Sequence, residues 1–150
     1  MILDVGCGAD PSGDINIDVT TEYENKNRNL RIKTSADVIA DGNFLPFKDL
    51  CFDKVVSRHV IEHTKTPFRF LKELIRVCKK KVELTCPHRF SGLAKGKNHE
   101  SYLNKTWFVK ACKSLNIDNI IIKTDLEVFK IGFLVLPLVR PREMTVRIFK

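Results

Sequence analysis

The sequence of 150 residues has few of the features that mark specialised protein classes. It contains 7 glycines and 6 prolines, too few for a collagen-like or low-complexity chain. Its 5 cysteines are odd in number and scattered, and no Cys-x-x-Cys pair occurs. Neither a disulfide framework nor a zinc ribbon is therefore expected. This use of cysteine is typical of a reducing compartment, so we expect a cytoplasmic protein.

Long apolar runs are also missing. The longest apolar stretch, from Val128 to Val139, contains Lys130 and is shorter than the roughly 20 residues that a membrane-spanning helix needs. The sequence does not open with a basic stretch followed by an apolar run, so no signal peptide is expected. No transmembrane segment is expected either.

The composition that is present indicates one globular domain over residues 1–150. The sequence is 43% hydrophobic and 29% charged, which is ordinary for a folded chain of this length. Its 26 Lys and Arg residues against 18 Asp and Glu residues give a net charge of +8. This balance favours anionic partners such as phosphorylated metabolites, nucleic acid or anionic lipid, although many basic proteins bind none of these.

Alternating strand and helix patterns run along the chain. Strands are predicted at Ile2–Val5, Ile15–Val19, Asp37–Ala40, Lys54–Ser57, Val82–Cys86 and Asn119–Lys123. One amphipathic helix is predicted after an N-cap at Thr66, with Pro67 at its first position, and a second from about Asn104 to Leu115. Such alternation predicts an α/β fold with a mostly parallel sheet. A final strand near Met144–Phe149 is expected to pair antiparallel with Asn119–Lys123.

The ends of the first three predicted strands carry glycines and carboxylates. The first strand runs into Gly6-Cys7-Gly8, where a missing Cβ lets backbone approach a ligand. The second ends at Asp18, whose two oxygens can accept hydrogen bonds from both hydroxyls of a ribose. The third ends at Asp41-Gly42, which can meet the edge of an adenine. A dinucleotide fingerprint is disfavoured, because Pro11 stands where the third glycine belongs.

With these motifs the sequence resembles the class I S-adenosylmethionine-dependent methyltransferases, in particular the small type 11 family. The resemblance covers about residues 2–90. The matching segments are Leu3–Gly8, Asn16–Asp18, Asp41–Phe47, Phe52–Ser57, Val60–His63 and Leu71–Val77. It implies a Rossmann-like sheet of seven strands with an antiparallel last strand, and S-adenosylmethionine as cofactor. The cofactor-binding residues that it implies are Asp4, Gly6, Cys7, Gly8, Asp18, Asp41, Gly42, Asn43 and Ser57.

The sequence departs from typical members of that family near its first strand. Helices before the first strand are missing, and only residues 6–13 separate that strand from Asp14. No crossover helix fits in such a segment. Eight residues extend to about 26 Å, which is enough to return beside a short parallel strand as a loop. We therefore expect the first crossover helix to be absent and part of one sheet face to be uncovered.

Histidines are the candidates for the catalytic step, because methyl transfer needs a base where the acceptor must lose a proton. We assign the catalytic role to His59, two residues beyond Ser57. For His63, preceded by Glu62, a structural hydrogen bond at a helix entry is favoured. A zinc site including His59 and His63 is disfavoured, because that spacing needs both residues on one helix and His59 lies near a strand end.

The segment from Pro87 to His99 follows the fifth predicted strand and contains three Lys and Arg residues and no acid. It is either a substrate lid or a solvated connection. As a lid, it would supply His88, Arg89 and His99 to the acceptor.

The leading hypothesis is a methyltransferase acting on a small or anionic acceptor. An RNA or protein methyltransferase and a non-catalytic S-adenosylmethionine-binding protein are the alternatives. Nucleic acid is not favoured as a partner, because no RNA-binding module is apparent. The apolar segment from Val128 to Val139 is expected to be buried in a homodimer, against the chain's own sheet, or against a membrane or an acceptor.

Overall fold

A computed structural model describes residues 1–25, 30–91, 100–101, 103–131 and 134–150. Side chains are described for these residues except at positions 25, 127–131 and 134–140.

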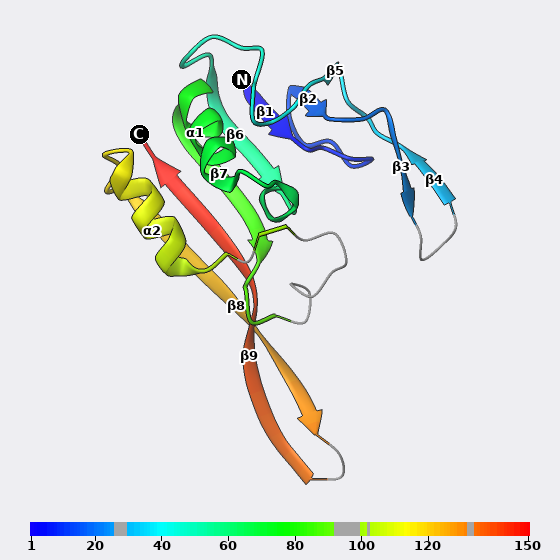
Figure 1. Ribbon diagram of the computed structural model, residues 1–150, viewed down its shortest axis with the longest axis vertical. Coiled ribbons are helices and arrows are strands. Elements are labelled where there is room, and N and C mark those ends of the chain that lie inside the picture. Colours follow the sequence, from blue (N-terminus) through cyan, green and yellow to red (C-terminus); the bar gives the residue numbers. More distant parts are fainter. Residues whose placement is uncertain (26–29, 92–99, 102, 132–133) are drawn as a thin grey trace.

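One sheet of seven strands forms the body of the protein (Figure 1). Its strands are β1 Ile2–Val5, β2 Ile15–Asp18, β5 Val38–Ile39, β6 Phe52–Arg58, β7 Cys78–Pro87, β8 Ile120–Ile131 and β9 Leu134–Phe149. They lie in the order β5-β2-β1-β6-β7-β9-β8, and the first five pair in parallel. β9 lies between β7 and β8, antiparallel to both. The α/β class with an antiparallel C-terminal strand is confirmed.

Two helices, α1 Pro67–Val77 and α2 Lys105–Ser114, cover one face of this sheet (Figure 1). Both were predicted, because their apolar residues recur at helical spacing, and both contribute to one hydrophobic core with the sheet. The expected cap at Thr66 is wrong in one respect. Its side chain makes no cap bond and instead donates to Asn43 Oδ1 at 2.9 Å, whereas Asn104 Oδ1 caps α2 by accepting from Trp107 N at 2.9 Å.

The connection from β1 to β2 contains no helix, as the sequence predicts. It turns back along β1, where Asp14 N donates to Ile2 O at 2.9 Å and Ile2 N donates to Asp14 Oδ2 at 2.7 Å. The amide and hydroxyl of Ser12 donate to the buried carboxylate of Asp4 at 2.9 and 2.7 Å. These bonds fix the loop without a helix.

A second, two-stranded sheet lies between β2 and β5 in sequence, and sequence reasoning missed it. It consists of β3 Glu22–Asn25 and the antiparallel β4 Leu30–Lys33. Ser35 N donates to Gly8 O at 2.7 Å, which ties the end of this hairpin to the glycine loop after β1.

The sheet face opposite the helices carries polar side chains. Along β7, Val82 and Leu84 are buried in the core, and Lys81 and Glu83 alternate with them on the other face. Glu83 forms ion pairs with Lys81 at 2.7 Å and with Arg147 at 2.9 Å. No helix lies on this face among the described residues, and its own charges make it compatible with water.

The apolar segment noted in the sequence, from 128 to 139, falls mostly on β8 and β9, which pair as far as Ile131 and Leu134. Its side chains lie outside the described residues, so its burial in a dimer, against the sheet or against a membrane stays a prediction. Among the described residues, no helix is long and apolar enough to cross a membrane.

The loop between β5 and β6 is held by Arg76 of α1. Its guanidinium donates to Leu45 O at 3.0 Å and Phe47 O at 2.8 Å, and to the carboxylates of Glu73 and Asp49. We expect Arg76→Lys to lower the free energy of unfolding by about 2 kcal/mol, because an ammonium cannot reproduce the planar fork. Urea denaturation measures this difference.

Arg69→Lys is the matched control on the same helix. Its guanidinium stacks on the exposed ring of Phe44, 3.7 Å from the ring centroid, and such a contact contributes only about 0.5–1 kcal/mol. Equal losses for the two variants would show that Arg76 does not hold the loop.

Candidate active site

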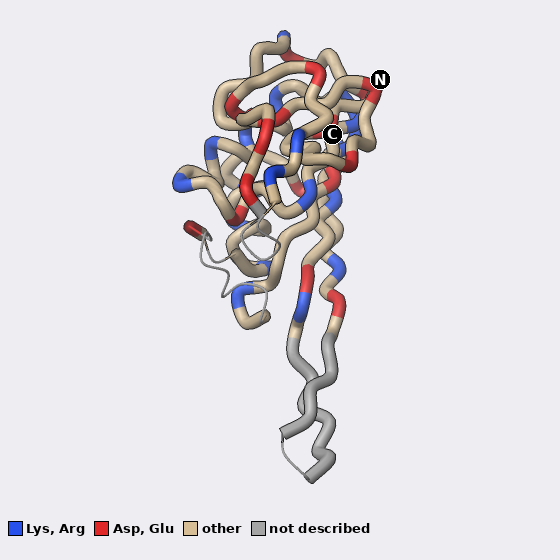
Figure 2. Tube along the Cα trace, turned by 90° about the vertical axis from the view of Figure 1, so that its right-hand side faces the viewer, with Lys and Arg blue, Asp and Glu red and all other residues tan. Residues whose placement is uncertain are grey.

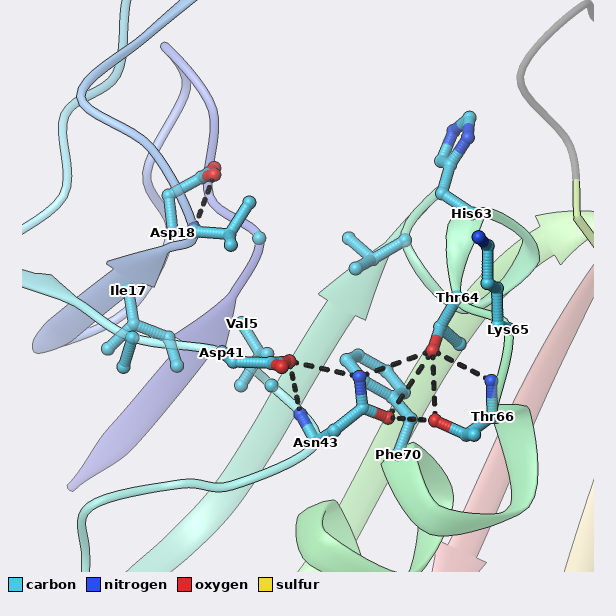
Figure 3. Close-up of a pocket in the computed structure, with 15 residues that line it drawn as sticks. Val5, Ile17, Asp18, Asp41, Asn43, His63, Thr64, Lys65, Thr66 and Phe70 are labelled. Atoms are coloured by element: carbon cyan, nitrogen blue, oxygen red, sulfur yellow. Dashed lines mark hydrogen bonds between the residues drawn. The ribbon is translucent and has the colours of Figure 1, made fainter.

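The carboxyl ends of β1, β2 and β5 and the turn after β6 surround a cavity of about 380 Å³ (Figure 3). The lining includes Val5, Gly6, Ile17, Asp18, Asp41, Gly42, Asn43, Val60, His63, Thr64 and Phe70. Figure 3 shows Asp18 and His63 on opposite sides of the cavity. In open α/β sheets, ligands bind at the carboxyl ends of the strands, so this cavity is the candidate site.

Gly6 forms the floor of the cavity and could not be another residue without rearrangement. Its φ is +75°, a conformation that favours glycine, and an added Cβ would meet the side chain of Val60 at 2.2 Å. The amides of Gly6 and Cys7 both donate to Ile17 O, at 2.8 and 3.1 Å. The chain therefore turns tightly between two strand ends and exposes backbone to the cavity.

Asp4 stabilises this loop through hydrogen bonds to its buried carboxylate. Its carboxylate is buried and accepts from Ser12 and from Arg58 Nη2, the latter at 3.2 Å. Arg58 also donates to Asp10 O at 2.7 Å, so one cation joins the end of β6 to the loop. Asp4 holds the loop and does not line the cavity.

Asp18 both lines the cavity and holds the loop. Its Oδ2 accepts from Gly8 N at 3.0 Å, and its Oδ1 accepts from Val19 N at 2.7 Å. Oδ1 also accepts from Thr20 N at 3.4 Å, whereas Oδ2 keeps a second acceptor position for a hydroxyl in the cavity.

A polar network forms the wall opposite Asp18. Asp41 Oδ1 accepts from the amide and side chain of Asn43 at 2.8 and 2.9 Å. Asn43 in turn bonds the hydroxyls of Thr64 and Thr66, which joins the loop after β5 to the start of α1 (Figure 3). The network fixes one polar wall of the cavity.

The ring of Phe70 supplies an apolar wall beside Gly42. An added Cβ at Gly42 would lie 2.4 Å from Phe70 Cε2, so this glycine lets the loop pack against the ring. The cavity thus has an apolar surface next to polar groups, as sites for planar heterocycles have.

A second cavity of about 660 Å³ adjoins the first. The two share the lining residues Gly6, Asp18, Val19, Val60 and His63. Only the second is also lined by Thr20, Tyr23, His59 and Glu100. Tyr23 comes from the unpredicted hairpin, so that hairpin forms part of the wall.

His59 lies in this second cavity between two carboxylates. Its Nδ1 is 3.4 Å from Glu62 Oε1, and its Nε2 is 2.5 Å from Glu143 Oε1. The hydrogen bond with Glu62 and the negative charges of both carboxylates raise the pKa of His59, against the opposing effect of burial. His59 is therefore biased toward the imidazolium form.

The remaining predicted residues that the structure describes line neither cavity. Ser57 is fully buried and donates to Val5 O at 2.9 Å, which joins β6 to β1. Cys7 is buried, and Gly8 contributes its amide to Asp18. His88 and Arg89 follow β7, and burial together with the charge of Arg89 lowers the pKa of His88. The predicted site residue His99 lies outside the described residues.

Several lining residues were missed in the sequence, because tertiary packing brings them to the site. Phe70 was predicted only as part of an amphipathic helix, and its apolar spacing is the one signal that it gives. Val60 lies in a segment that matches the family, but its contact with Gly6 comes from the fold. Thr64 follows that segment without a distinguishing pattern, and Tyr23 belongs to a strand of polar residues.

Comparisons with known proteins agree with this geometry. A family model described as a methyltransferase domain matches residues 3–86, more than half of the chain. No curated protein matches the sequence.

Solved structures share the fold at low sequence identity. An S-adenosylmethionine-dependent methyltransferase from Archaeoglobus fulgidus is 15% identical with a TM-score of 0.70, and the match covers 99% of this chain and 85% of that one. One from Thermotoga maritima is 16% identical with a TM-score of 0.69, over 99% and 81%. An arsenic(III) S-adenosylmethionine methyltransferase from Chlamydomonas reinhardtii is 18% identical with a TM-score of 0.66, over 99% and 63%.

Proposed function

Because the chain belongs to the methyltransferase domain family and is an S-adenosylmethionine-dependent methyltransferase, we propose that its two adjoining cavities hold the cofactor and the acceptor. The observation that carries this proposal is the set of residues that the cavities share. A methyl group must pass directly from one ligand to the other, so the two ligands need a common boundary.

The first cavity has the groups that S-adenosylmethionine needs. We assign the adenine to the side formed by Asp41, Gly42 and Phe70, where an apolar ring adjoins polar atoms. Asp18 is assigned to the ribose hydroxyls, and the exposed backbone at Gly6 to the methionine portion. Asn43 fixes the wall, while Asp4, Cys7, Gly8 and Ser57 act through the loop and strand contacts described above.

The second cavity is proposed to bind a small acceptor. Its lining offers hydrogen-bonding groups on Asp18, Tyr23, His59 and Glu100. The similar Chlamydomonas enzyme is named for arsenic(III), a very small acceptor, which agrees with this assignment. His88 and Arg89 lie beyond the cavity lining, so we propose that they contact the acceptor only if it is larger or anionic.

The chain's own residues contribute mainly position and exclusion of water. The cofactor supplies a methyl group on a sulfonium, which a nucleophile attacks in line. Val60 and Gly6 form the surface where both cavities meet, and Val60 excludes water from that boundary. His59 is assigned to the acceptor cavity as the candidate catalytic residue.

A macromolecular acceptor is the second candidate, and the net charge of +8 favours it. Figure 2 shows basic and acidic residues interspersed over the body of the chain rather than separated by sign. Nucleic-acid binding favours a basic patch or stripe, so this distribution favours the small acceptor.

Label transfer identifies the acceptor class. The protein is incubated with methyl-tritiated S-adenosylmethionine and a cell extract, which is then separated into small molecules, RNA and protein. We expect label in the small-molecule fraction, and no label with the Gly6→Ala variant. Label in RNA or protein alone would contradict the small acceptor. Cofactor binding without transfer to any fraction would favour the non-catalytic alternative.

A further inference from the structure

We propose that His59, Glu62 and Glu143 form a charged clamp that positions Val60 against Gly6 and thereby sets the shape of the boundary between the two cavities. The effect on ligand binding rests on the proposed function, whereas the clamp itself does not. Here His59 is a positioning residue, and this role takes the place of the catalytic one, because an imidazolium has no free lone pair with which to accept a proton.

The clamp joins three separate parts of the chain. His59 follows the end of β6, Glu62 lies in a 3-10 turn at Ile61–His63, and Glu143 comes from β9. Both ring nitrogens of His59 face carboxylates, at 3.4 Å and 2.5 Å. An imidazolium offers two N–H donors, so its charged form matches both partners.

Glu62 makes the charge of His59 necessary. Its side chain is only 3% exposed, and apart from the imidazole of His59, 3.4 Å away, its carboxylate has no hydrogen-bond partner among the described residues. A buried carboxylate is costly unless a cation lies beside it. The nearby thiol of Cys86 stays neutral, because burial and the charges of Glu62 and Glu143 raise its pKa. Among the described residues, His59 is the cation that lies within ion-pair distance of Glu62.

Backbone contacts hold Glu62 in place. Its carbonyl accepts from Glu100 N at 2.9 Å and from Ser101 N at 3.0 Å. The segment before α2 therefore fixes the backbone of the turn that carries Glu62. The charge on His59 remains the simplest way to stabilise the buried carboxylate.

The backbone conformation of His59 connects the ion pairs of its ring to the boundary between the two cavities. Its φ is +54°, a left-handed conformation that is unfavourable for a residue other than glycine. His59 N donates to Thr85 O at 2.8 Å, and the next residue is Val60, whose side chain packs on Gly6 and lines both cavities. Releasing the ring of His59 would let this conformation relax and move Val60.

The clamp predicts a direction for pH dependence. Glu62 is the first cause of the raised pKa of His59, so the folded-state value lies above the ordinary 6.5. The clamp then stabilises the fold fully below about pH 6.5 and is lost as pH rises through the folded-state pKa. Among the described residues, Glu62 and Glu143 contact His59, and the ionisable groups that line the second cavity with it are Asp18, Tyr23, His63 and Glu100.

The test compares wild type with His59→Gln and Glu143→Gln between about pH 6 and pH 8.5, the range in which a histidine of raised pKa titrates. Melting temperature is measured without ligand, and affinity for S-adenosylhomocysteine is measured by calorimetry. In the wild type both should fall as pH rises. The loss of affinity should be roughly three- to tenfold, which corresponds to a pKa difference of up to about one between bound and free protein.

The variants decide the interpretation. His59→Gln should remove the pH dependence of both quantities, and Glu143→Gln should move the transition to lower pH. Glu83→Gln is the matched control, because ion pairs with Lys81 and Arg147 lower the pKa of Glu83 to about 2 despite its partial burial, so it does not titrate in this range. It should keep the wild-type pH dependence.

Unchanged pH dependence in His59→Gln would overturn the clamp. If that variant fails to fold, a pH transition in Glu143→Gln at the wild-type position would overturn it instead. If S-adenosylhomocysteine does not bind at any pH, the proposed function fails. The melting curves, recorded without ligand, still test the clamp in that case.

Discussion

Gly6→Ala is expected to reduce the affinity for S-adenosylmethionine on the order of 100-fold while leaving the fold intact. The new Cβ would meet Val60 at 2.2 Å, and the φ of +75° is unfavourable for alanine. Overpacking and the left-handed backbone together cost roughly 2–4 kcal/mol, and each 1.4 kcal/mol is about tenfold in affinity. Titration calorimetry measures the affinity, and circular dichroism checks the fold.

Gly8→Ala is the control for Gly6→Ala, because it has similar backbone strain without the overlap. Gly8 has φ of +57°, and the nearest atom to an added Cβ is the hydroxyl of Tyr23 at 4.0 Å. We expect a loss of less than about tenfold from this variant. An equal loss from both variants would show that the contact between Val60 and Gly6 does not shape the cofactor cavity.

Asp18→Asn is expected to weaken cofactor binding by about 1.5–3 kcal/mol, which is the effect of losing hydrogen bonds to a charged group. In dissociation constant this is roughly 10- to 150-fold. The substitution keeps the size of the side chain and replaces an acceptor oxygen by a donor, so it removes hydroxyl recognition with little change in packing. Calorimetry measures the change.

Asp37→Asn is the control for Asp18→Asn. Asp37 Oδ2 accepts from the amide of Asn16, which lies on the same strand as Asp18, at 2.8 Å. Asp37 does not line the first cavity. This variant should lose stability without a comparable loss of affinity. Wild-type affinity in a well-folded Asp18→Asn variant would rule out the proposed role in binding the ribose.

Much of the sheet could be predicted because its strands and helices follow local rules. Pro67 and the apolar spacing of the helix that it begins mark α1, and glycines and acids mark the strand ends. The hairpin of β3 and β4 was missed, because each strand has four residues and β3 is polar. The sequence of β4, Leu30–Lys33, does alternate apolar and polar residues, but four residues are too few for a clear signal. The polar face of β7 was visible in its own alternation, and the short connection after the first strand indicated that part of one sheet face would be uncovered.

The site was predictable to the extent that parallel strands end at one edge. Gly6, Asp18 and Asp41 come together for that reason. Ser57 was expected near the cofactor, but the side chains of β6 alternate between faces and place it in the core. The contact between His59 and Glu143 joins residues distant in sequence, and only the antiparallel insertion of β9 beside β7 brings them together.

The most direct test is a titration of ¹⁵N-labelled protein with S-adenosylhomocysteine, followed by NMR. We expect the largest amide shifts at Gly6, Asp18, Gly42 and Thr64, which line the first cavity, and small shifts along the polar face at Lys81 and Glu83. The absence of shifts at saturating ligand, or shifts centred on that polar face, would contradict a cofactor site at the carboxyl ends of β1, β2 and β5.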